Sequence, residues 1–381
     1  MKAYDVLIIG VGGWGSAALY HLAKRGLRVC GIEQFSLGHY RGSSHGESRV
    51  IRMAYFMHPD YVPVLRRAYE LWRELEKATG ESLMTLPGLL CIGEPEGPFI
   101  RGLETCYATH DLPHERWTVA QAMTRFPQFH LPEDATCYWD PLGGYLRADA
   151  CVRTHARLAQ QHGAEILENE EVIAIEDDGR GVTVRTTGQT LRAAKVILTT
   201  GAFAQDLTTE LGQVVVAQRK VLFWYETPDP AAFGAGRFPV WIAKIGGLNY
   251  YGFPSTDGLT IKAAEDTGGE VLDNARTVTT TMRSDDESNL GPFMQNLFGP
   301  KLGVRRAHKT CLYENTSDRN FIVDVHPQKQ NVILAVGGSG HGFKFCSVIG
   351  EMAADLAETG RSSLRPDIFA LGNRALPMSA S

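Results

Sequence analysis

The sequence has no long hydrophobic run, no paired cysteine motif and little net charge. No apolar stretch approaches the ~20 residues that span a bilayer, and the N-terminus lacks the basic region and cleavage site of a signal peptide. The seven cysteines contain no C-x-x-C pair, which argues against a zinc site and a disulfide framework. A net charge of -5 gives no general attraction to nucleic acid. We therefore expect a cytoplasmic protein without a membrane, nucleic-acid or metal partner.

The first forty residues predict a dinucleotide-binding unit. The apolar run YDVLIIG (residues 4–10) is typical of a buried parallel strand and leads into a G-x-G-x-x-G pattern formed by Gly10, Gly12 and Gly15. A helix predicted over residues 14–25 then directs its N-terminus at phosphate groups. A second strand ends at Glu33, where a carboxylate accepts hydrogen bonds from an adenosine ribose. The pattern does not distinguish NAD from FAD.

The next segment is unusual for a simple NAD domain. FSLGHYRGSSHGESRVIR (residues 35–52) is rich in small residues and carries Arg49 and Arg52. Small residues suit a backbone that approaches a ligand, and arginines suit anionic groups. The alternative is a solvated basic loop.

A second strand-to-glycine turn lies near the C-terminus. In NVILAVGGSGHGFKF (residues 331–345) an apolar strand runs into four glycines, and a helix predicted to end before Gly360 follows. This helix N-terminus can stabilise negative charge on a ligand such as reduced flavin. The GGSGH segment (residues 337–341) lacks the final glycine of a nucleophile elbow, which argues against a serine hydrolase.

Cys311 lies in HKTCLYENTSDRNFIVDV (residues 308–325), among basic residues. Arg305, Arg306, His308 and Lys309 are expected to favour its thiolate. The alternative is a buried free thiol, as we expect for Cys30, Cys91 and Cys346.

The chain is long enough for two domains, because 381 residues with 44% hydrophobic side chains can fill two cores. A helix over residues 147–161 and short strands at 165–167, 172–175 and 182–186 precede the strand-and-glycine segment AKVILTTGAFA. Residues 84–146 and 214–305 are richer in aromatic and β-branched residues. We expect an α/β (α+β) fold with a discontinuous Rossmann-like domain (1–83, 147–213 and 306–381), which is FAD-binding according to the family resemblance given below, and a mostly antiparallel substrate domain (84–146 and 214–305).

Four motifs, in this order and spacing, resemble the monomeric sarcosine oxidase and N-methyltryptophan oxidase family of FAD-dependent amine and imino-acid oxidases. They are GSSHGESRVIR, YYGFPS, KTCLY with the later DRNFIVD, and GGSGHGFKF. The resemblance covers essentially the whole chain. It implies FAD as the cofactor, a monomer, and a small amino acid and O2 as reactants.

The resemblance also implies roles for individual residues. Cys311 matches the cysteine that forms a thioether to the flavin 8α-methyl carbon, and Arg52 and Lys344 match the pair that binds the substrate carboxylate. Lys262 matches the lysine beside flavin N5, where oxygen is reduced, and Tyr251 matches an active-site tyrosine. Arg49 and His45 match flavin-side positions, while His341 is placed to contact ring or substrate. The remaining cofactor residues so predicted are Gly10, Gly12, Gly13, Trp14, Gly15, Glu33, Gln34, Arg41, Ser43, Ser44, Val172, Gly201, Gly338, Gly340, Gly342 and Phe343.

Asp266 departs from this pattern, because sarcosine-oxidising relatives have a histidine four residues after the lysine that matches Lys262. A carboxylate favours a cationic substrate nitrogen. A bulkier N-alkyl amino acid, or a cyclic imino acid such as pipecolate or proline, is therefore as good a candidate as sarcosine.

The sequence predicts a covalent FAD-dependent oxidase of secondary amino acids that gives an imine, then amino acid plus aldehyde, and H2O2. One alternative is a flavin dehydrogenase that uses another electron acceptor. A second is a non-enzymatic protein that retains FAD for stability, although Arg52, Lys344 and Lys262 are not needed for that.

Overall fold

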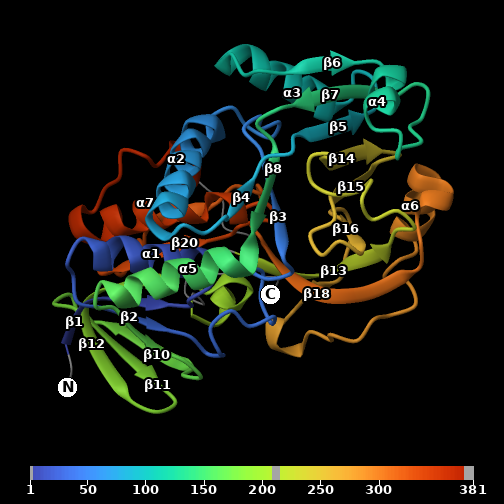
Figure 1. Ribbon diagram of the computed structural model, residues 1–381. Helices are drawn as coiled ribbons and strands as arrows, with labels where there is room; N and C mark the ends of the chain where they lie inside the picture. The colour runs from blue at the N-terminus through green and yellow to red at the C-terminus, as the bar shows by residue number, and fades with distance from the viewer. Residues whose placement is uncertain (1–2, 208–214, 373–381) are drawn as a thin grey trace.

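The computed structural model describes residues 3–207 and 215–372 of the chain, which form two large sheets joined by a small one (Figure 1). Within these residues the first sheet has eight strands and runs in the order β10-β11-β12-β1-β2-β9, with β20 beside β12 and β19 beside β20. Its strands are β1 (Ala3–Ile9), β2 (Val29–Ile32), β9 (Glu165–Leu167), β10 (Val172–Asp177), β11 (Val182–Thr186), β12 (Thr190–Leu198), β19 (Ile322–Val325) and β20 (Val332–Val336).

The centre of this sheet is parallel, as the dinucleotide-binding prediction requires. β1 pairs in parallel with β2 and β12, and the later part of β12 pairs in parallel with β20. The β10–β11 hairpin is antiparallel and pairs with the first half of β12, which confirms the predicted antiparallel excursion. The apolar runs fill the sheet because both of its faces are covered.

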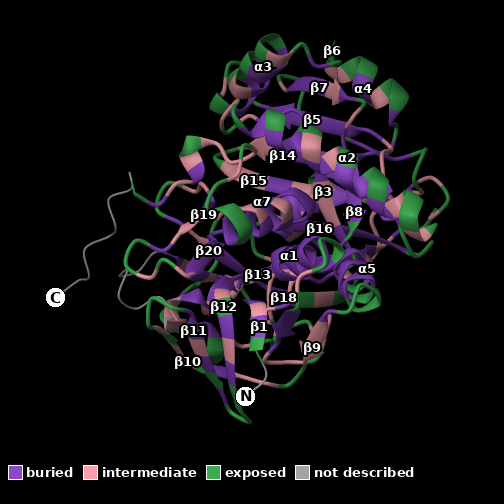
Figure 2. Ribbon diagram, turned by 90° about the vertical axis from the view of Figure 1, so that its left-hand side faces the viewer, coloured by how far each residue is buried: buried purple, intermediate pink, exposed green. Residues whose placement is uncertain are grey.

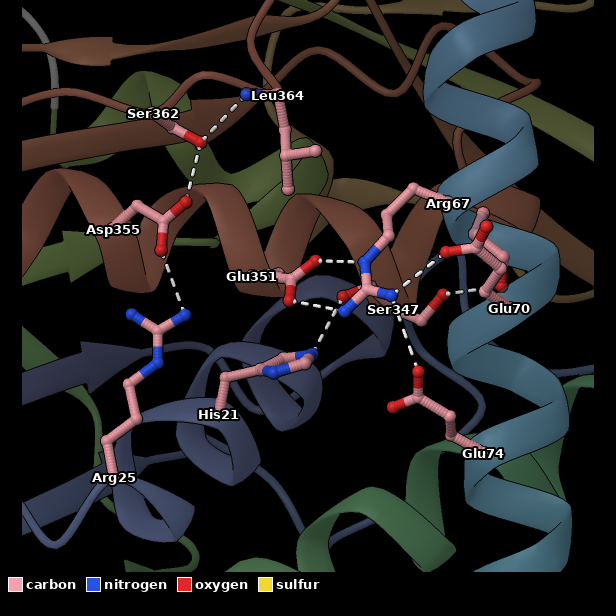
Figure 3. A network of polar contacts seen from close by, with 11 residues as sticks. His21, Arg25, Arg67, Glu70, Glu74, Ser347, Glu351, Asp355, Ser362 and Leu364 are labelled. Carbon is pink, nitrogen blue, oxygen red and sulfur yellow. Dashed lines mark hydrogen bonds and ion pairs between the residues drawn. The ribbon is translucent and has the colours of Figure 1, made fainter.

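Four helices pack around this sheet: α1 (Gly13–Lys24), α2 (Tyr61–Thr79), α5 (Ala148–Gln161) and α7 (Cys346–Thr359). α1 and α7 are buried along most of their length (Figure 2). α7 ends at Gly360, whose φ of 74° closes the helix in the left-handed region, as the sequence predicts. Ion pairs fix α7 to its neighbours: Arg67 of α2 contacts Glu351 at 2.8 Å, and Arg25 contacts Asp355 at 2.9 Å (Figure 3).

The second sheet has nine strands in the described chain and is antiparallel except where β14 pairs with β5. The order is β17-β13-β16-β15-β14-β5-β7-β6, with β18 on the free side of β13. Its strands are β5 (Leu89–Gly93), β6 (Glu115–Trp117), β7 (Thr136–Asp140), β13 (Val216–Glu226), β14 (Val240–Ile245), β15 (Leu248–Phe253), β16 (Thr260–Glu265), β17 (Val271–Leu272) and β18 (Arg305–Asn315).

The outer part of this sheet is covered by α3 (Pro98–His110), α4 (Val119–Arg125) and α6 (Leu290–Phe298). The three-stranded sheet β3-β8-β4 connects the two larger ones and consists of β3 (Ser48–Ile51), β4 (Met84–Thr85) and β8 (Gly144–Arg147). Short 3-10 turns occupy Gly201–Leu207, Ala275–Thr277, Gly299–Lys301, Phe343–Phe345 and Asp367–Phe369. No helix of the described residues is long and apolar enough to cross a membrane.

The observed fold is the mixed α/β arrangement expected from the sequence. The predicted domain boundary at residue 306 falls one residue inside β18, a strand that pairs along its length with β13 of the second sheet. The division of the chain into two domains therefore stays a prediction, with β18 lying at the contact between the two parts.

Candidate active site

A cavity of about 560 Å³ lies between the two large sheets. It extends from the carboxyl ends of β1 and β2 to the face of β14 and β15, and its volume is in the range of small-molecule and cofactor sites. Most of the predicted site residues line it: Gly10, Gly12, Gly13, Trp14, Glu33, Gln34, Ser43, Ser44, Arg49, Arg52, Val172, Gly201, Tyr251, Asp266, Cys311, Gly338, Gly340, His341, Gly342, Phe343 and Lys344. Among the described residues, Gly15, Arg41, His45 and Lys262 are not part of the lining.

The N-terminal glycine turn is tight because the backbone and the helix approach each other closely. Gly10 has a φ of 89°, and a Cβ on Gly15 would lie 1.8 Å from the carbonyl oxygen of Gly10. Glu33 stabilises the turn, because its carboxylate accepts hydrogen bonds from the backbone N–H of Val11 at 2.9 Å and of Phe35 at 3.0 Å. The turn is therefore built by the chain itself before any ligand binds.

The C-terminal glycine turn meets the N-terminal one. The indole Nε1 of Trp14 donates to the carbonyl oxygen of Gly342 at 3.1 Å, and the backbone N–H of Gly13 donates to Ser44 Oγ at 3.0 Å. Three segments that lie far apart in the sequence, around residues 13, 44 and 342, thus form one end of the cavity.

Cys311 lies on β18 with its side chain toward the cavity, and the cation beside it comes from a distant segment. Arg49 Nη2 donates toward Cys311 Sγ at 3.4 Å. Arg305, Arg306, His308 and Lys309 were expected to act on this thiol, but three of them pair elsewhere. Arg305 contacts Glu287 at 2.9 Å, Arg306 contacts Glu226 at 3.2 Å and Lys309 contacts Glu47 at 3.9 Å. The reason is that β18 is extended, so a side chain nearby in sequence lies several ångströms farther along the strand.

Side chains on one face of the second sheet line the cavity, and the pairing of β14 with β15 determines which ones. Ile242 of β14 is opposite Tyr251 of β15, and Lys244 is opposite Asn249 one step along. All four line the cavity. Toward the other end of β15, Phe253 is paired with Lys262 of β16. Lys262 therefore lies two residues beyond the level of Tyr251, about 7 Å along the strand direction.

Lys262 is buried and its ammonium is fully engaged. Nζ donates to the carbonyl oxygens of Gly46 and Ser48, both at 2.7 Å, and lies 4.7 Å from the centre of the Phe253 ring. Burial and then the nearby Arg49 guanidinium hold the pKa of Lys262 well below its usual value. The lysine therefore links β16 to the 46–48 turn, behind the cavity lining.

Arg52 and Lys344 form the cationic end of the cavity. Both are buried, at 6% and 3% exposure, and both contact the ring of Tyr55, at 5.0 Å and 5.5 Å. Lys344 Nζ donates to the carbonyl oxygen of His341 at 2.7 Å, whereas Arg52 Nε has no hydrogen-bond partner among the described residues. Burial and then Arg52 lower the pKa of Lys344 well below its usual value. Two desolvated cations side by side are suited to a carboxylate ligand.

Asp266 is at the same end of the cavity. Its carboxylate Oδ1 accepts a hydrogen bond from the hydroxyl of Tyr313 at 3.1 Å, and its backbone N–H donates to Asn249 at 2.7 Å. The carboxylate is therefore held toward the cavity by β15 and β18.

His341 is neutral and its tautomer is fixed. Nε2 is 2.9 Å from the carbonyl oxygen of Arg319, which only accepts, so Nε2 carries the proton and Nδ1 accepts from the hydroxyl of Tyr55. Burial, and then Lys344, hold the His341 pKa well below its usual value.

The two remaining predicted residues lie outside the lining. His45 is buried, its Nε2 is 3.1 Å from the carbonyl oxygen of Gly42, and burial lowers its pKa to about 3. Arg41 is exposed and stacks on the Phe35 ring, with 4.9 Å from Cζ to the ring centre.

Sequence reasoning missed several residues of the lining. They are Phe56, Lys244, Tyr313, Glu314 and Arg319. Burial raises the pKa of Glu314 to about 7 and lowers that of Lys244 to about 8. Tyr313 follows Cys311 by two residues and so lies on the same face of β18, a signal that the alternation of an extended strand offers. Lys244 needed the register of β14 against β15, which sequence alone does not provide.

Several features of the cavity are suited to FAD. α1 begins at Gly13 with no acidic residue in its first turn and no side-chain cap, so its N–H groups are suited to a pyrophosphate. A Cβ on Gly12 would meet only Ser44 Oγ, at 3.4 Å, which leaves the backbone open to the cavity. Thr200 Oγ1 and Glu314 Oε2 belong to lining residues, are buried and have no partner in the described chain. No group of three or more His, Cys, Asp or Glu residues suited to a metal ion occurs among the described residues.

Comparison with known proteins agrees with this geometry. The family described as FAD dependent oxidoreductase matches residues 5–356. A monomeric sarcosine oxidase from Streptomyces avermitilis is 37% identical, over 94% of this chain and 95% of its own, and an N-methyl-L-tryptophan oxidase from Yersinia pestis is 33% identical, over 97% and 98%. The open form of NikD, an unusual amino acid oxidase, has the same fold, with a TM-score of 0.87 at 24% identity over 97% of this chain and 98% of that one. The protein belongs to the FAD-dependent oxidoreductase family, in the group that contains the sarcosine and N-methyltryptophan oxidases.

Proposed function

We propose that the protein is a covalent FAD-dependent oxidase of secondary amino acids. The observation that carries this proposal is that one cavity is lined by the glycine turn suited to a dinucleotide, by the thiol of Cys311 and by two buried cationic side chains, Arg52 and Lys344. A protein that retained FAD only for stability would not need two buried cations where no cofactor phosphate is expected.

The residues at the cationic end are suited to orient an amino acid. Arg52 and Lys344 hold the substrate carboxylate, and the unpaired Nε of Arg52 provides one donor for it. Asp266, held by Tyr313, accepts a hydrogen bond from the substrate amine. When bound, FAD supplies the two-electron oxidation of the carbon beside the amine and passes the electrons to O2, which gives H2O2. Water then hydrolyses the imine to an amino acid and an aldehyde, or opens the ring of a cyclic imino acid.

The thiol of Cys311 is the proposed attachment point of the flavin, through a thioether to the 8α-methyl carbon. The Arg49 guanidinium at 3.4 Å stabilises the thiolate that must attack that carbon. Attachment would be a net two-electron oxidation, in which a C–S bond would replace the S–H bond of Cys311 and one C–H bond of the methyl group. O2 would accept the two electrons and the two hydrogens and give H2O2.

One observation favours a second candidate, a dehydrogenase that uses an acceptor other than O2. Lys262, the residue proposed to assist oxygen reduction, donates to Gly46 and Ser48 and does not line the cavity in the described chain. We retain the oxidase because two carbonyl oxygens hold Lys262 Nζ directly behind the cavity lining, where the protonated amine stabilises the negative charge that develops on O2.

The experiment that tests the proposal is an anaerobic screen of N-methyl and cyclic amino acids, with flavin bleaching as the readout. Bleaching by a secondary amino acid followed by rapid recovery in air supports the oxidase. Bleaching with slow recovery supports the dehydrogenase, and no bleaching by any secondary amino acid contradicts both.

We further propose that the protein acts as a monomer in the cytoplasm. The proposal is supported by the name of the Streptomyces relative, a monomeric enzyme, and by seven cysteines that are all free and buried. Sedimentation equilibrium of the purified flavoprotein tests the monomer.

A further inference from the structure

Two cations of the cavity lining have no task in the proposed reaction. Lys244 lies on β14, on the same face as Ile242, and Arg319 lies in the loop between β18 and β19. Both line the cavity at the end that contains Arg52, Lys344 and Asp266. Arg319 is tied to this end because its carbonyl oxygen accepts from His341.

The ammonium of Lys244 is held against aromatic rings. Nζ lies 4.3 Å from the ring centre of Phe56 and 5.5 Å from that of Phe99, and within the described residues it has no hydrogen bond and no ion pair. Burial, and to a smaller extent Arg52 and Arg319, lower its pKa to about 8. Asp266 is the nearby anion that acts on this ammonium, but it makes no ion pair with it in the described residues, so a ligand anion can bind there.

The backbone of Arg319 has a conformation that few residues other than glycine adopt. Its φ of 64° lies in the left-handed region, and one guanidinium nitrogen, Nη1, donates to Asn315 Oδ1 at 2.7 Å. A guanidinium has five N–H donors, so this bond leaves capacity for a ligand in the cavity.

The charges at this end do not balance with a simple amino acid. Arg52, Lys344, Lys244 and Arg319 line the cavity, and the carboxylate that acts on both lysines is that of Asp266. The carboxylate of Glu314 accepts instead from the N–H of Gly338 in the glycine turn. The α-carboxylate of a substrate offsets one more positive charge. Such an excess of buried positive charge is costly unless the ligand provides a further anion.

We propose that Lys244 and Arg319 bind a second carboxylate on the substrate, so that the enzyme acts on dicarboxylic secondary amino acids. The oxidation of such substrates rests on the proposed function, whereas the binding of a second carboxylate does not. Arg52 and Lys344 hold the α-carboxylate, Asp266 faces the amine, and the second carboxylate lies against β14. It is attached either to the side chain, as in N-methylglutamate, or to the nitrogen, as in iminodiacetate.

The binding test uses glutarate and butyrate, which differ by one carboxylate and contain no amine to be oxidised. Each is titrated into the oxidised flavoprotein and followed by the change in flavin absorbance. We expect glutarate to bind about tenfold more tightly or better. Lys244→Met should lower the glutarate-to-butyrate affinity ratio by about fivefold or more, and Lys244→Arg should restore most of it. Lys77→Met, at an exposed lysine of α2, is the matched control and should leave the ratio unchanged.

The kinetic test compares N-methylglutamate with N-methylglutamine, and iminodiacetate with sarcosine, by kcat/KM. A preference of about tenfold or more for one of the charged members, lost in Lys244→Met, supports the inference and identifies where the second carboxylate is attached. Equal affinities for glutarate and butyrate, or a ratio that Lys244→Met does not change, overturn it even if neutral N-methyl amino acids bleach the flavin. If no secondary amino acid bleaches the flavin, the proposed function fails, and the glutarate titration still decides whether the second carboxylate site exists.

Discussion

Arg49 Nη2 and Cys311 Sγ lie 3.4 Å apart although 262 residues separate them in the sequence. The guanidinium also donates to the carbonyl oxygens of Ser43 and Ser48, so its position is fixed by the turn that carries it. An arginine stays charged in proteins, so Arg49 provides a permanent positive charge beside the sulfur of Cys311.

This contact predicts how the flavin becomes attached. Cys311→Ser should release all yellow colour from the protein on acid precipitation, whereas the unmutated protein should retain it in the pellet. Arg49→Gln should slow the covalent incorporation of added FAD into apoprotein by about tenfold or more, because the thiolate loses its counter-charge. Arg306→Gln, at an exposed arginine that pairs with Glu226, is the control and should not slow it. Colour released from the unmutated protein would contradict the covalent link.

Lys262 is expected to assist the reaction of the reduced flavin with O2 and to have little effect on the reduction of the flavin by the amino acid. Lys262→Met should slow reoxidation of the reduced flavin by O2 about 10²-fold, because a preorganised charge near the developing anion is lost. Anaerobic reduction by the substrate should change much less. Stopped-flow measurement of the two half-reactions separates these effects, and an equal loss in both would indicate a structural role through Gly46 and Ser48.

Asp266 is expected to bind the amine of the substrate. Asp266→Asn should raise KM about tenfold, because a charge-assisted hydrogen bond becomes a neutral one. The matched control is Glu265→Gln, one residue earlier on β16, where the carboxylate accepts from Thr267 and does not line the cavity. Similar KM values in Asp266→Asn and Glu265→Gln would exclude this role.

Alanine substitutions at two glycines of the N-terminal turn, Gly15 and Gly12, are expected to have different effects. Gly15→Ala should prevent folding, since its Cβ would lie 1.8 Å from the Gly10 carbonyl. Gly12→Ala should fold, since its Cβ meets only Ser44 Oγ at 3.4 Å, but should bind FAD about tenfold more weakly because the methyl group occupies the cavity. Circular dichroism and flavin content measure the two properties, and a full flavin content in Gly12→Ala would mean that the cofactor backbone does not approach this glycine.

Buried neutral histidines predict a loss of stability in acid. Burial lowers the pKa of His155 to about 3, below the ~6.5 of an unfolded chain. The unfolded state therefore takes up a proton first as pH falls below 6.5, and stability is lost. Between pH 7.5 and 5.5 His155 should account for about 1 kcal/mol of this loss.

Denaturant unfolding of His155→Leu at the two pH values checks this contribution. The decrease in unfolding free energy from pH 7.5 to 5.5 should be smaller than in the unmutated protein by that amount. His162→Leu, at an exposed histidine of the same region, should show the unmutated decrease. An unchanged decrease in His155→Leu would contradict the assignment.

The local parts of the fold could be predicted from the sequence. The strands at residues 165–167 and 182–186 have the predicted bounds, because apolar runs between turn residues are a local signal. The Gly10 turn and the Gly360 helix end were predicted for the same reason. What could not be predicted depends on pairing between distant strands: Arg49, and not its sequence neighbours, contacts Cys311, and the register of β14 with β15 directs Lys244 into the cavity. Spacing along a chain contains no information on that register.

The hydrogen bond from Trp14 to Gly342 has a consequence for biosynthesis. The cavity is lined by the N-terminal glycine turn, the 43–49 segment, β18 and the 337–344 turn. The ribosome must therefore have released almost the whole polypeptide before a binding site for FAD exists. An N-terminal unit that folds early during synthesis would hold β1, β2 and α1 without β12 and β20 beside them. Flavin therefore binds only after nearly all of the chain has been synthesised, because residues from both ends of the sequence line its site.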